Sequence, residues 1–425
     1  MTSAAEAQQL LRAGRVNEAE RAYLAILEAD PGHAEALQAT GIIALSDGKV
    51  SRALELLNQA AAGNPAEPLT QHYLGLAQEA AGDLQAAIAC QQRALQSEPD
   101  FQAARLHLGR NFEQTQQLAA AAVQYARALQ DAQQQGRWLS PDTTPVPMRE
   151  PVERAVRFVR EHRRTALHEL FAPLRSRYGP EALRRVEKCL RIHLNEEAPD
   201  YPDARQQPSF LFFPDLPASA YLDRSLFPWI PALEAHTADI RSELLALLPS
   251  SRGRERVFTS VELEQVNLRG LDVAPSWNGY YFYRHGERRD DNCSACPATA
   301  AAIDAVPLSR IRDHGPEVLF SVFTPGTHLL PHRGVTNTRL VGHLPLLIPD
   351  DCALRVGGEL HPWQEGHVVV FDDTYEHEAW NRSGKTRVVL IFDIWSPYLT
   401  AAERAAVADL IAAVGDFRQA VDGAH

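Results

Sequence analysis

In the C-terminal half of the chain, short apolar runs rich in β-branched and aromatic residues alternate with clusters of Pro, Gly, Asp and Asn. Apolar runs bounded by turn-forming residues predict antiparallel strands joined by turns. The predicted strands of this region are 318–323, 339–348, 352–356, 367–371 and 386–394. The aromatic run at 277–284 predicts one more strand. We therefore expect a β-rich domain, entered through a helix at 230–247 and followed by a C-terminal helix from about residue 400 to 417.

The first part of the chain has a different pattern, because small residues recur at a fixed interval. Three columns repeat every 34 residues: Gly14, Gly48 and Gly82; Ala19, Ala53 and Ala87; Pro31, Pro65 and Pro99. Glycine suits a tight turn between two helices, alanine lets the helices approach closely, and proline ends the second helix. The array resembles tetratricopeptide repeats, whose period is 34 residues. The alanine column continues at Ala121, but Gln116 replaces the glycine, so we expect a degenerate fourth repeat.

These patterns divide the chain into four regions. The repeat array covers 1–135, and a linker with bridging helices covers 136–207, where the Gln-, Pro- and Thr-rich stretch at 133–152 lacks any helical or strand period. The β-rich domain covers 208–400, and the terminal helix covers 401–425. The fold class is α + β multidomain. The arginines of 153–193 lie in amphipathic helices without interleaved aromatics, which favours a solvated helix face over a nucleic-acid surface.

Charge and cysteine usage limit the classes of partner and compartment. A formal net charge of −12 argues against general nucleic-acid binding, since phosphates would be repelled. The sequence shows no signal-like segment and no apolar run of membrane-spanning length, so we expect no membrane partner. Five cysteines in a chain of 425 residues favour a reducing, cytoplasmic location. Cys293 and Cys296 form a lone CxxC pair, which is weak evidence for zinc.

Candidate chemistry lies between residues 321 and 397. His332 and His377 each stand in or beside a turn next to an apolar run, and Arg387 opens the last run. An iron and 2-oxoglutarate site in a double-stranded β-helix has the same order of residues: a first histidine, a second histidine, and then an arginine on the following strand. Two imidazoles suit iron. The usual third ligand, a carboxylate two residues after the first histidine, is absent because that position is Gly334.

Residues 208–400 resemble the aspartyl/asparaginyl β-hydroxylase family. The resemblance rests on PGTHLLPHRG, on TNTRL followed by HL, on FDDTYEHEAWN and on RVVLIFDIWSP. It implies a jelly-roll or cupin-like double-stranded β-helix that uses Fe(II), 2-oxoglutarate and O2. The animal member also has glycine at the position of Gly334 and holds iron through two histidines alone. His332 and His377 would therefore be the metal ligands, with Asp373 placed to hydrogen bond to metal-bound water.

The resemblance also implies roles for residues around the metal. Arg387 would bind the distal carboxylate of 2-oxoglutarate with the Ser321 hydroxyl, and His343 would reach its 1-carboxylate. Trp277 matches an aromatic residue that lines the site, and Arg339 and Arg288 match basic positions that could meet an acidic substrate. The chain departs from the family at Val341, where a second arginine is common, and at Ala300, which replaces the partner of Cys293.

Together these patterns predict a 2-oxoglutarate-dependent dioxygenase that hydroxylates a protein or peptide. The favoured position is the β-carbon of Asp or Asn, and the groove of the repeats would recruit the substrate. One alternative keeps the chemistry but changes the substrate to a free amino acid such as proline or to a lipid acyl chain. Another is a non-catalytic adaptor, in which the repeats bind a partner and the β domain has lost turnover. Val341 favours the adaptor, whereas both histidines and Arg387 argue against it.

Overall fold

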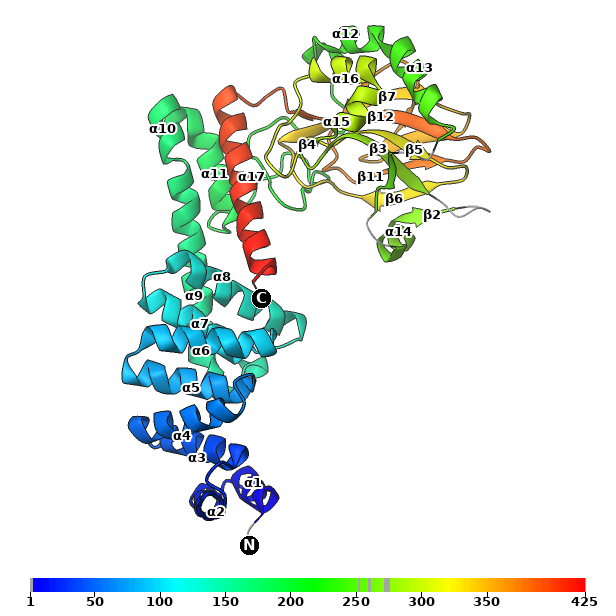
Figure 1. Cartoon of the computed structure of the whole chain (residues 1–425). Coiled ribbons are helices and arrows are strands. Elements are labelled where there is room, and N and C mark those ends of the chain that lie inside the picture. The colour runs from blue at the N-terminus through cyan, green and yellow to red at the C-terminus, as the bar shows by residue number, and fades with distance from the viewer. Residues whose placement is uncertain (1–2, 251–252, 259–260, 271–275, 425) are drawn as a thin grey trace. The chain divides into compact units, whose positions relative to one another are not determined.

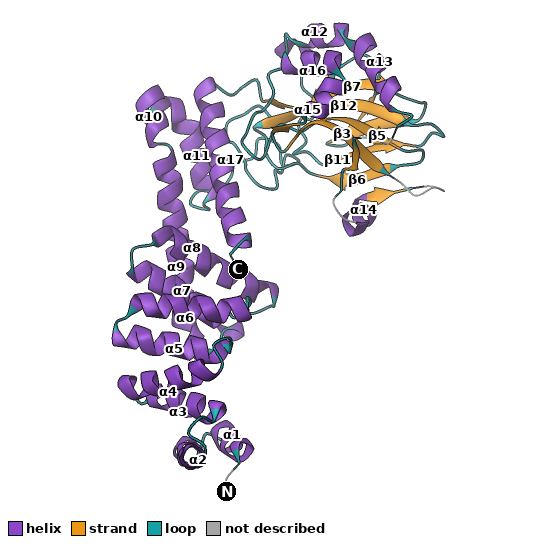
Figure 2. Ribbon diagram, in the orientation of Figure 1, coloured by secondary structure: helices purple, strands orange, loops and turns teal. Residues whose placement is uncertain are grey.

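The computed structural model describes residues 3–250, 253–258, 261–270 and 276–424. It contains two compact units, one formed by Met1–Ala166 with Asp416–His425 and the other by Leu167–Gly415 (Figure 1). The first unit is helical, and the second combines helices with two antiparallel sheets (Figure 2).

The N-terminal unit is a stack of helix hairpins. The helices are α1 (Ala4–Arg12), α2 (Val16–Ala29), α3 (Ala34–Ser46), α4 (Val50–Gly63), α5 (Pro68–Ala81), α6 (Leu84–Ser97), α7 (Gln102–Gln114) and α8 (Leu118–Gln134). The first glycine column lies in the tight turns, where Gly14, Gly48 and Gly82 have φ of 74°, 74° and 85°. Gln116 adopts the same left-handed conformation at φ 59°, so the fourth hairpin keeps the turn without the glycine. The helical solenoid expected from the repeats is therefore present.

A second glycine column explains how closely the hairpin helices pack, and the sequence interpretation missed it. Gly41, Gly75 and Gly109 are buried or nearly so on the first helix of successive hairpins. A Cβ atom there would lie 2.7 Å from Leu57 Cγ, 2.5 Å from Gln91 Nε2 and 2.7 Å from Tyr125 Cδ1, respectively. Both the glycines and the residues they meet recur every 34 positions, so each repeat places its two helices in contact at the same point.

The region 136–207, expected to hold a linker and bridging helices, is largely helical. It holds η1 (Pro141–Thr143), η2 (Val146–Met148), α9 (Arg149–Leu170), α10 (Ala172–Tyr178), η3 (Glu181–Leu183) and α11 (Arg184–His193). Its arginines pair with carboxylates, as in Arg175 with Glu187 at 2.6 Å and Arg185 with Glu403 at 2.7 Å. Apolar residues of α11 pack with those of α17 (Ala401–Asp422), for example Leu190 and Leu410 in one cluster. No helix among the described residues has the length and apolarity required to span a bilayer.

Two antiparallel sheets form the β domain. One has the order β1 (Arg254–Arg256), β3 (Trp277–Arg284), β5 (Val318–Phe323), β12 (Arg387–Trp395), β7 (Arg339–Leu347) and β10 (Val369–Phe371), with β4 (Glu287–Arg288) paired to β3. The other has the order β2 (Leu268–Arg269), β6 (His328–His332), β11 (His377–Asn381), β8 (Cys352–Val356) and β9 (Glu359–Pro362). From β5 onward the chain crosses repeatedly between the sheets, so residues distant in sequence meet between them.

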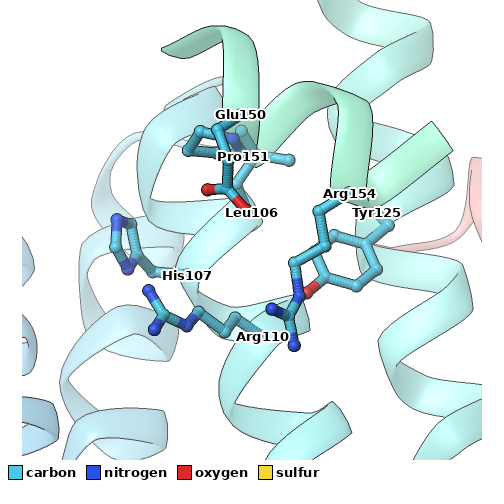
Figure 3. A pocket seen from close by; sticks show the side chains of 7 residues that line it. All are labelled: Leu106, His107, Arg110, Tyr125, Glu150, Pro151 and Arg154. Carbon is cyan, nitrogen blue, oxygen red and sulfur yellow. The ribbon is translucent and has the colours of Figure 1, made fainter. Parts of the chain in front are cut away.

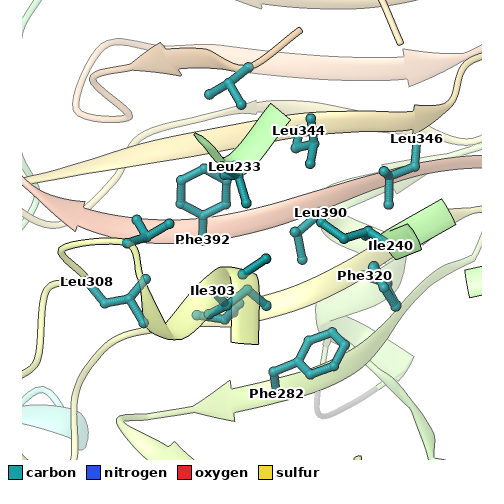
Figure 4. Packing of buried hydrophobic residues seen from close by; sticks show 14 of the residues in the cluster. Leu233, Ile240, Phe282, Ile303, Leu308, Phe320, Leu344, Leu346, Leu390 and Phe392 are labelled. Atoms are coloured by element: carbon teal, nitrogen blue, oxygen red, sulfur yellow. The ribbon is translucent and has the colours of Figure 1, made fainter. Parts of the chain in front are cut away.

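The strand period of two divides the first sheet into an outer and an inner face. Along β12, Leu390 and Phe392 join an apolar cluster with four helices: α12 (Ile230–Ala235), α13 (Thr237–Leu247), α15 (Asp290–Ala295) and α16 (Pro297–Asp304) (Figure 4). The alternate residues Val389 and Ile391 belong to or pack against a second cluster, which contains residues of both sheets. By the same alternation, Arg387 on β12 and His343 on β7 face the space between the sheets.

Three sequence-based expectations about the elements need correction. The helix expected at 230–247 is two helices, α12 and α13, which break at His236, where Thr237 Oγ1 donates to the Glu234 carbonyl at 2.6 Å. The sequence did not predict the five-residue strands β6 and β11, which His332 ends and His377 begins. The terminal helix extends to Asp422 rather than ending near residue 417.

The second glycine column leads to a stability prediction. Replacing Gly109 with Ala should destabilise the helical unit by about 1 to 3 kcal/mol, because the new methyl group would overlap the ring of Tyr125. Gly63→Ala is the matched control, since nothing lies within 4 Å of its Cβ position, and it should be neutral or slightly stabilising. Urea unfolding followed by circular dichroism at 222 nm measures both. Equal effects of the two substitutions would contradict the close contact.

Candidate functional site

The two predicted metal-binding histidines lie side by side on neighbouring strands. His377 of β11 is the register partner of His332 of β6, and their ring centroids are 4.0 Å apart. Nδ1 of each ring bonds to a backbone carbonyl two residues earlier, of Leu330 at 2.8 Å and of Tyr375 at 3.0 Å. Because a carbonyl only accepts, each Nδ1 carries a proton, and Nε2 is left as the ring nitrogen that can bind a metal. Burial lowers the pKa of His377 to about 3, so its ring is neutral. This is the form in which imidazole binds metal.

Asp373 occupies the space that a side chain at position 334 would need. A Cβ added to Gly334 would lie 2.1 Å from Asp373 Cγ and 2.2 Å from its Oδ1. The Gly334 amide also donates to the Asp373 carbonyl at 2.6 Å, which fixes the two backbones against each other. The Asp373 carboxylate thus occupies the volume in which a side chain at position 334 would lie.

Asp373 is itself held by a partly buried arginine. Arg339 Nη2 donates to Asp373 Oδ2 at 3.0 Å, and Arg339 Nη1 donates to Asp393 Oδ2 at 2.9 Å. Burial raises the pKa of Asp373, while Arg339 acts in the opposite direction. Asp373 Oδ1 is buried and has no hydrogen-bond partner in the described part of the chain. In those same residues no group of three or more His, Cys, Asp and Glu side chains is arranged to bind a metal, so a metal here would rest on the two imidazoles.

Arg387 is a buried cation without a carboxylate. Its side chain is 1% exposed, and its guanidinium carbon lies 4.0 Å from the ring centre of Trp363 and 4.6 Å from that of Phe323. Within the described ranges no acidic side chain forms an ion pair with it, and its Nε has no partner. Burial lowers its pKa to about 9. Burying an uncompensated charge is costly, so this position is suited to an incoming anion.

Ser321 and Trp277 complete the surroundings of Arg387. The Ser321 hydroxyl oxygen accepts from Trp277 Nε1 at 2.9 Å and from Arg387 Nη1 at 3.3 Å. Both lone pairs of that oxygen are therefore occupied. The hydroxyl proton remains available, and it too calls for an acceptor.

Ring contacts connect the arginine to the histidine pair. His343 lies 5.9 Å from Trp363 and 5.0 Å from Phe371, and Phe371 lies 5.6 Å from His377, as centroid distances. Burial, reinforced by Arg387, lowers the pKa of His343 well below its usual value, so this imidazole is neutral. Its Nδ1 has no hydrogen-bond partner among the described residues. The histidine pair and the arginine are thus two ends of one region between the sheets.

Some sequence-predicted residues are placed differently. Arg288, on β4, pairs with Asp290 at 2.7 Å and Asp304 at 3.4 Å, and none of its described contacts reaches another predicted site residue. Arg339 uses both Nη atoms on Asp373 and Asp393. Val341 is 8% exposed and lies opposite Phe371 on β10 within the inter-sheet apolar cluster. The roles of Arg288 and Arg339 toward a substrate remain predictions.

Sequence interpretation missed Trp363, which contacts Arg387 and His343. It lies in HPWQEG, between a short exposed strand and a turn, where the local pattern gives no strand or helix signal. The sequence shows only that Trp363 is an isolated aromatic residue among turn-forming residues. Cys293 and Cys296 are buried and not disulfide-bonded, and Cys293 Sγ contacts the Phe282 carbonyl at 3.7 Å.

The helical unit carries a hollow of its own. Leu106, His107 and Arg110 of α7 line a pocket with Tyr125 of α8 and the start of α9, where Arg154 pairs with Glu113 at 3.0 Å (Figure 3). His107 and Arg110 also line a second pocket, whose other lining residues come from α3, α5 and α7: Leu45, Leu76, Glu79, Ala80 and Gln114. The first helices of successive hairpins thus form a hollowed face with mixed charge.

The contact between Gly334 and Asp373 gives a prediction. Gly334→Ala should lower the stability of the β domain by about 1 to 3 kcal/mol in the wild type, but by much less in an Asp373→Ala background, because the overlapping carboxylate is then absent. Urea unfolding followed by tryptophan fluorescence measures the double-mutant cycle. Gly384→Ala, which meets nothing within 4 Å, serves as the control. Equal costs in both backgrounds would contradict the assignment of Asp373 to this space.

Comparison with known proteins places both parts of the chain. Residues 234–397 match the family described as Aspartyl/Asparaginyl beta-hydroxylase, and residues 4–68 and 74–137 match the tetratricopeptide repeat. The chain is 35% identical over 183 residues to an ornithine lipid ester-linked acyl 2-hydroxylase of Rhizobium tropici, covering 42% of this chain and 62% of that protein.

Two further relatives are similar to part of the chain. One is the human aspartyl/asparaginyl beta-hydroxylase, 34% identical over 41% of this chain and 22% of that protein. The other is aspartate beta-hydroxylase domain-containing protein 2 of Xenopus tropicalis, 32% identical over 56% of this chain and 62% of that protein. The chain thus spans less than two thirds of the length of each of these three relatives. Its residues 234–397 are thus similar to the aspartyl/asparaginyl beta-hydroxylase family, and they follow an N-terminal array that matches the tetratricopeptide repeat.

Proposed function

We propose that the protein is an Fe(II)- and 2-oxoglutarate-dependent hydroxylase. The observation that carries the proposal is the pairing of an uncompensated buried cation, Arg387, with two adjacent imidazoles, His332 and His377, at the two ends of one inter-sheet region. The strand order supports it. From β5 to β12 the chain alternates between two four-stranded halves, β5-β12-β7-β10 and β6-β11-β8-β9, as a double-stranded β-helix does.

The unpartnered polar atoms fit 2-oxoglutarate. Arg387 and the free proton of Ser321 would bind the distal carboxylate, as a fork of donors suits a carboxylate. His343, whose Nδ1 lacks a partner, would bind near the 1-carboxylate on the side of the metal. These groups are donors or neutral imidazole, and an anionic acceptor between them would satisfy several at once.

The histidine pair fits iron. The carbonyls of Leu330 and Tyr375 bind Nδ1 of the two rings, which fixes the orientation of the rings and leaves Nε2 of each as the metal-binding nitrogen. When bound, iron would supply the activation of dioxygen, coupled to oxidative decarboxylation of 2-oxoglutarate to succinate and carbon dioxide, which inserts one oxygen atom into a C–H bond.

The chain's own residues position the reactants and exclude water. Arg339 holds Asp373 with one Oδ directed away from the ion pair, where it would accept from a water at the metal. The inter-sheet cluster, including Val341, Phe371 and Val389, keeps the region apolar around these polar atoms. A dry surrounding strengthens each charge interaction inside it.

The substrate we propose is a polypeptide, hydroxylated at the β-carbon of Asp or Asn and recruited by the hollowed face of the repeats. The family match and the presence of the repeats support it. A second candidate is an acyl chain. It is favoured by the name of the Rhizobium tropici relative and by Val341, which puts an apolar side chain where the family resemblance implies a second arginine.

A spectroscopic titration tests the cofactor site. Anaerobic addition of Fe(II) and 2-oxoglutarate to the full-length protein should give the weak visible charge-transfer band of the chelate. His332→Ala should abolish the band by removing a ligand, and Arg387→Ala should weaken 2-oxoglutarate binding at least about 100-fold, because a charged contact is lost. Arg355→Ala, which removes a half-exposed arginine paired with Glu378, should leave the titration unchanged. A folded wild type without the band would refute the proposal.

A product assay separates the two substrate candidates. The full-length protein, supplied with Fe(II), 2-oxoglutarate and O2, is incubated with an Asp- and Asn-containing peptide library or with ester-linked acyl lipids. A mass gain of one oxygen located on Asp or Asn supports the polypeptide, and the same gain on an acyl carbon supports the lipid. His332→Ala should remove either product. Succinate release with no oxygenated product from either pool would exclude both substrate classes.

A further inference from the structure

We propose that Trp363 is a further residue of the 2-oxoglutarate pocket, where its indole N–H binds an oxygen of the ligand and its ring fixes the plane of Arg387. The inference rests on the proposed function and adds to it a residue that the sequence did not indicate. It starts from the contact between the Arg387 guanidinium and the Trp363 ring, at 4.0 Å, and from the burial of Trp363, which is 7% exposed.

The unpartnered atoms around Trp363 cannot satisfy one another. Trp363 Nε1 and Arg387 Nε are both buried without a hydrogen-bond partner in the described residues, and both are donors only. A buried donor left unpaired costs about 1 to 3 kcal/mol of stability. The two unpaired donors of Trp363 and Arg387, whose side chains are in contact, therefore destabilise the fold unless an acceptor binds to them. A carboxylate has several acceptor sites and can serve both. The same argument makes indole a better partner here than a purely apolar ring.

The Trp363 ring also orients the Arg387 side chain. The guanidinium lies between the faces of Trp363 and Phe323, at 4.0 and 4.6 Å, which restricts its rotation and leaves its edge for a ligand. An arginine that is already oriented loses less entropy when a carboxylate binds.

The loop that carries Trp363 is fixed to the first sheet. Glu365 Oε1 accepts from the Ile348 amide at 2.9 Å, and the Gly366 amide donates to the Pro345 carbonyl at 2.9 Å. Both partners lie at or just beyond the end of β7, the strand that carries His343. The indole is therefore held relative to the pocket by the backbone, which a residue that positions Arg387 requires.

Two substitutions separate the roles of Trp363. Trp363→Phe keeps a ring over Arg387 but removes the N–H, and should weaken 2-oxoglutarate binding about tenfold. Trp363→Leu removes both and should weaken it further. Binding of 2-oxobutyrate, which lacks the distal carboxylate, should fall less in both variants, so the preference for 2-oxoglutarate over 2-oxobutyrate should shrink.

The experiment is anaerobic calorimetry of both acids with the full-length, Fe(II)-loaded protein. Trp380→Phe is the matched control, because Trp380 is also buried beneath an arginine, Arg382 at 4.6 Å, but lies outside the inter-sheet cluster. It should bind both acids as the wild type does. Fe(II) affinity and the thermal midpoint, measured for every variant, report on folding.

Each outcome has a definite meaning. A Trp363→Phe protein that binds 2-oxoglutarate as tightly as the wild type overturns the inference and leaves the proposed function standing. Equal losses for 2-oxoglutarate and 2-oxobutyrate, with a lowered thermal midpoint, show a structural role only and also overturn it. A wild type that binds neither acid refutes the proposed function, and the inference with it.

Discussion

The period of two along the central strands is the constraint on which the site depends. On β5, β7 and β12, one set of side chains packs under the helices, and the alternate set faces the second sheet. Ser321, His343 and Arg387 come from these three different strands and reach the same space because each falls on the inner set. A register shift of one residue would move all three to the helix-covered face.

The inter-sheet space holds two arginines in opposite electrostatic situations. Arg339 lies between Asp373 and Asp393, so its charge is compensated within the chain and it serves as a structural cation. Arg387 has a serine hydroxyl and two aromatic faces around it but no carboxylate among the described residues. Since a buried charge is stable only when it is paired, the first arginine maintains the site and the second is available to a ligand. Burial lowers the pKa of Arg387, and its Nε is left without a hydrogen-bond partner in the described residues.

Glycine at position 334 is explained by the close approach of the Asp373 side chain. Without a Cβ, the chain there admits the Asp373 carboxylate, which is fixed by Arg339 and approaches the two histidines from another strand connection. A carboxylate attached at 334 and the carboxylate of Asp373 could not occupy the same volume. A carboxylate at position 334 and the ion pair of Asp373 with Arg339 are therefore alternatives within this fold, and the chain contains the second.

The sequence by itself determined the repeat array, the main strands, the order of His332, His377 and Arg387, and through motif resemblance the family. These features depend on local periodicity or on spacing along the chain, which is visible without a fold. Only the tertiary structure decided that His332 and His377 are register partners and that Trp363 covers Arg387. It also decided that Arg339 forms ion pairs with two aspartates and that Arg288 pairs with surface carboxylates. Each of these contacts joins residues from separate turns or strands, and burial and pairing of charges arise only when those elements pack together.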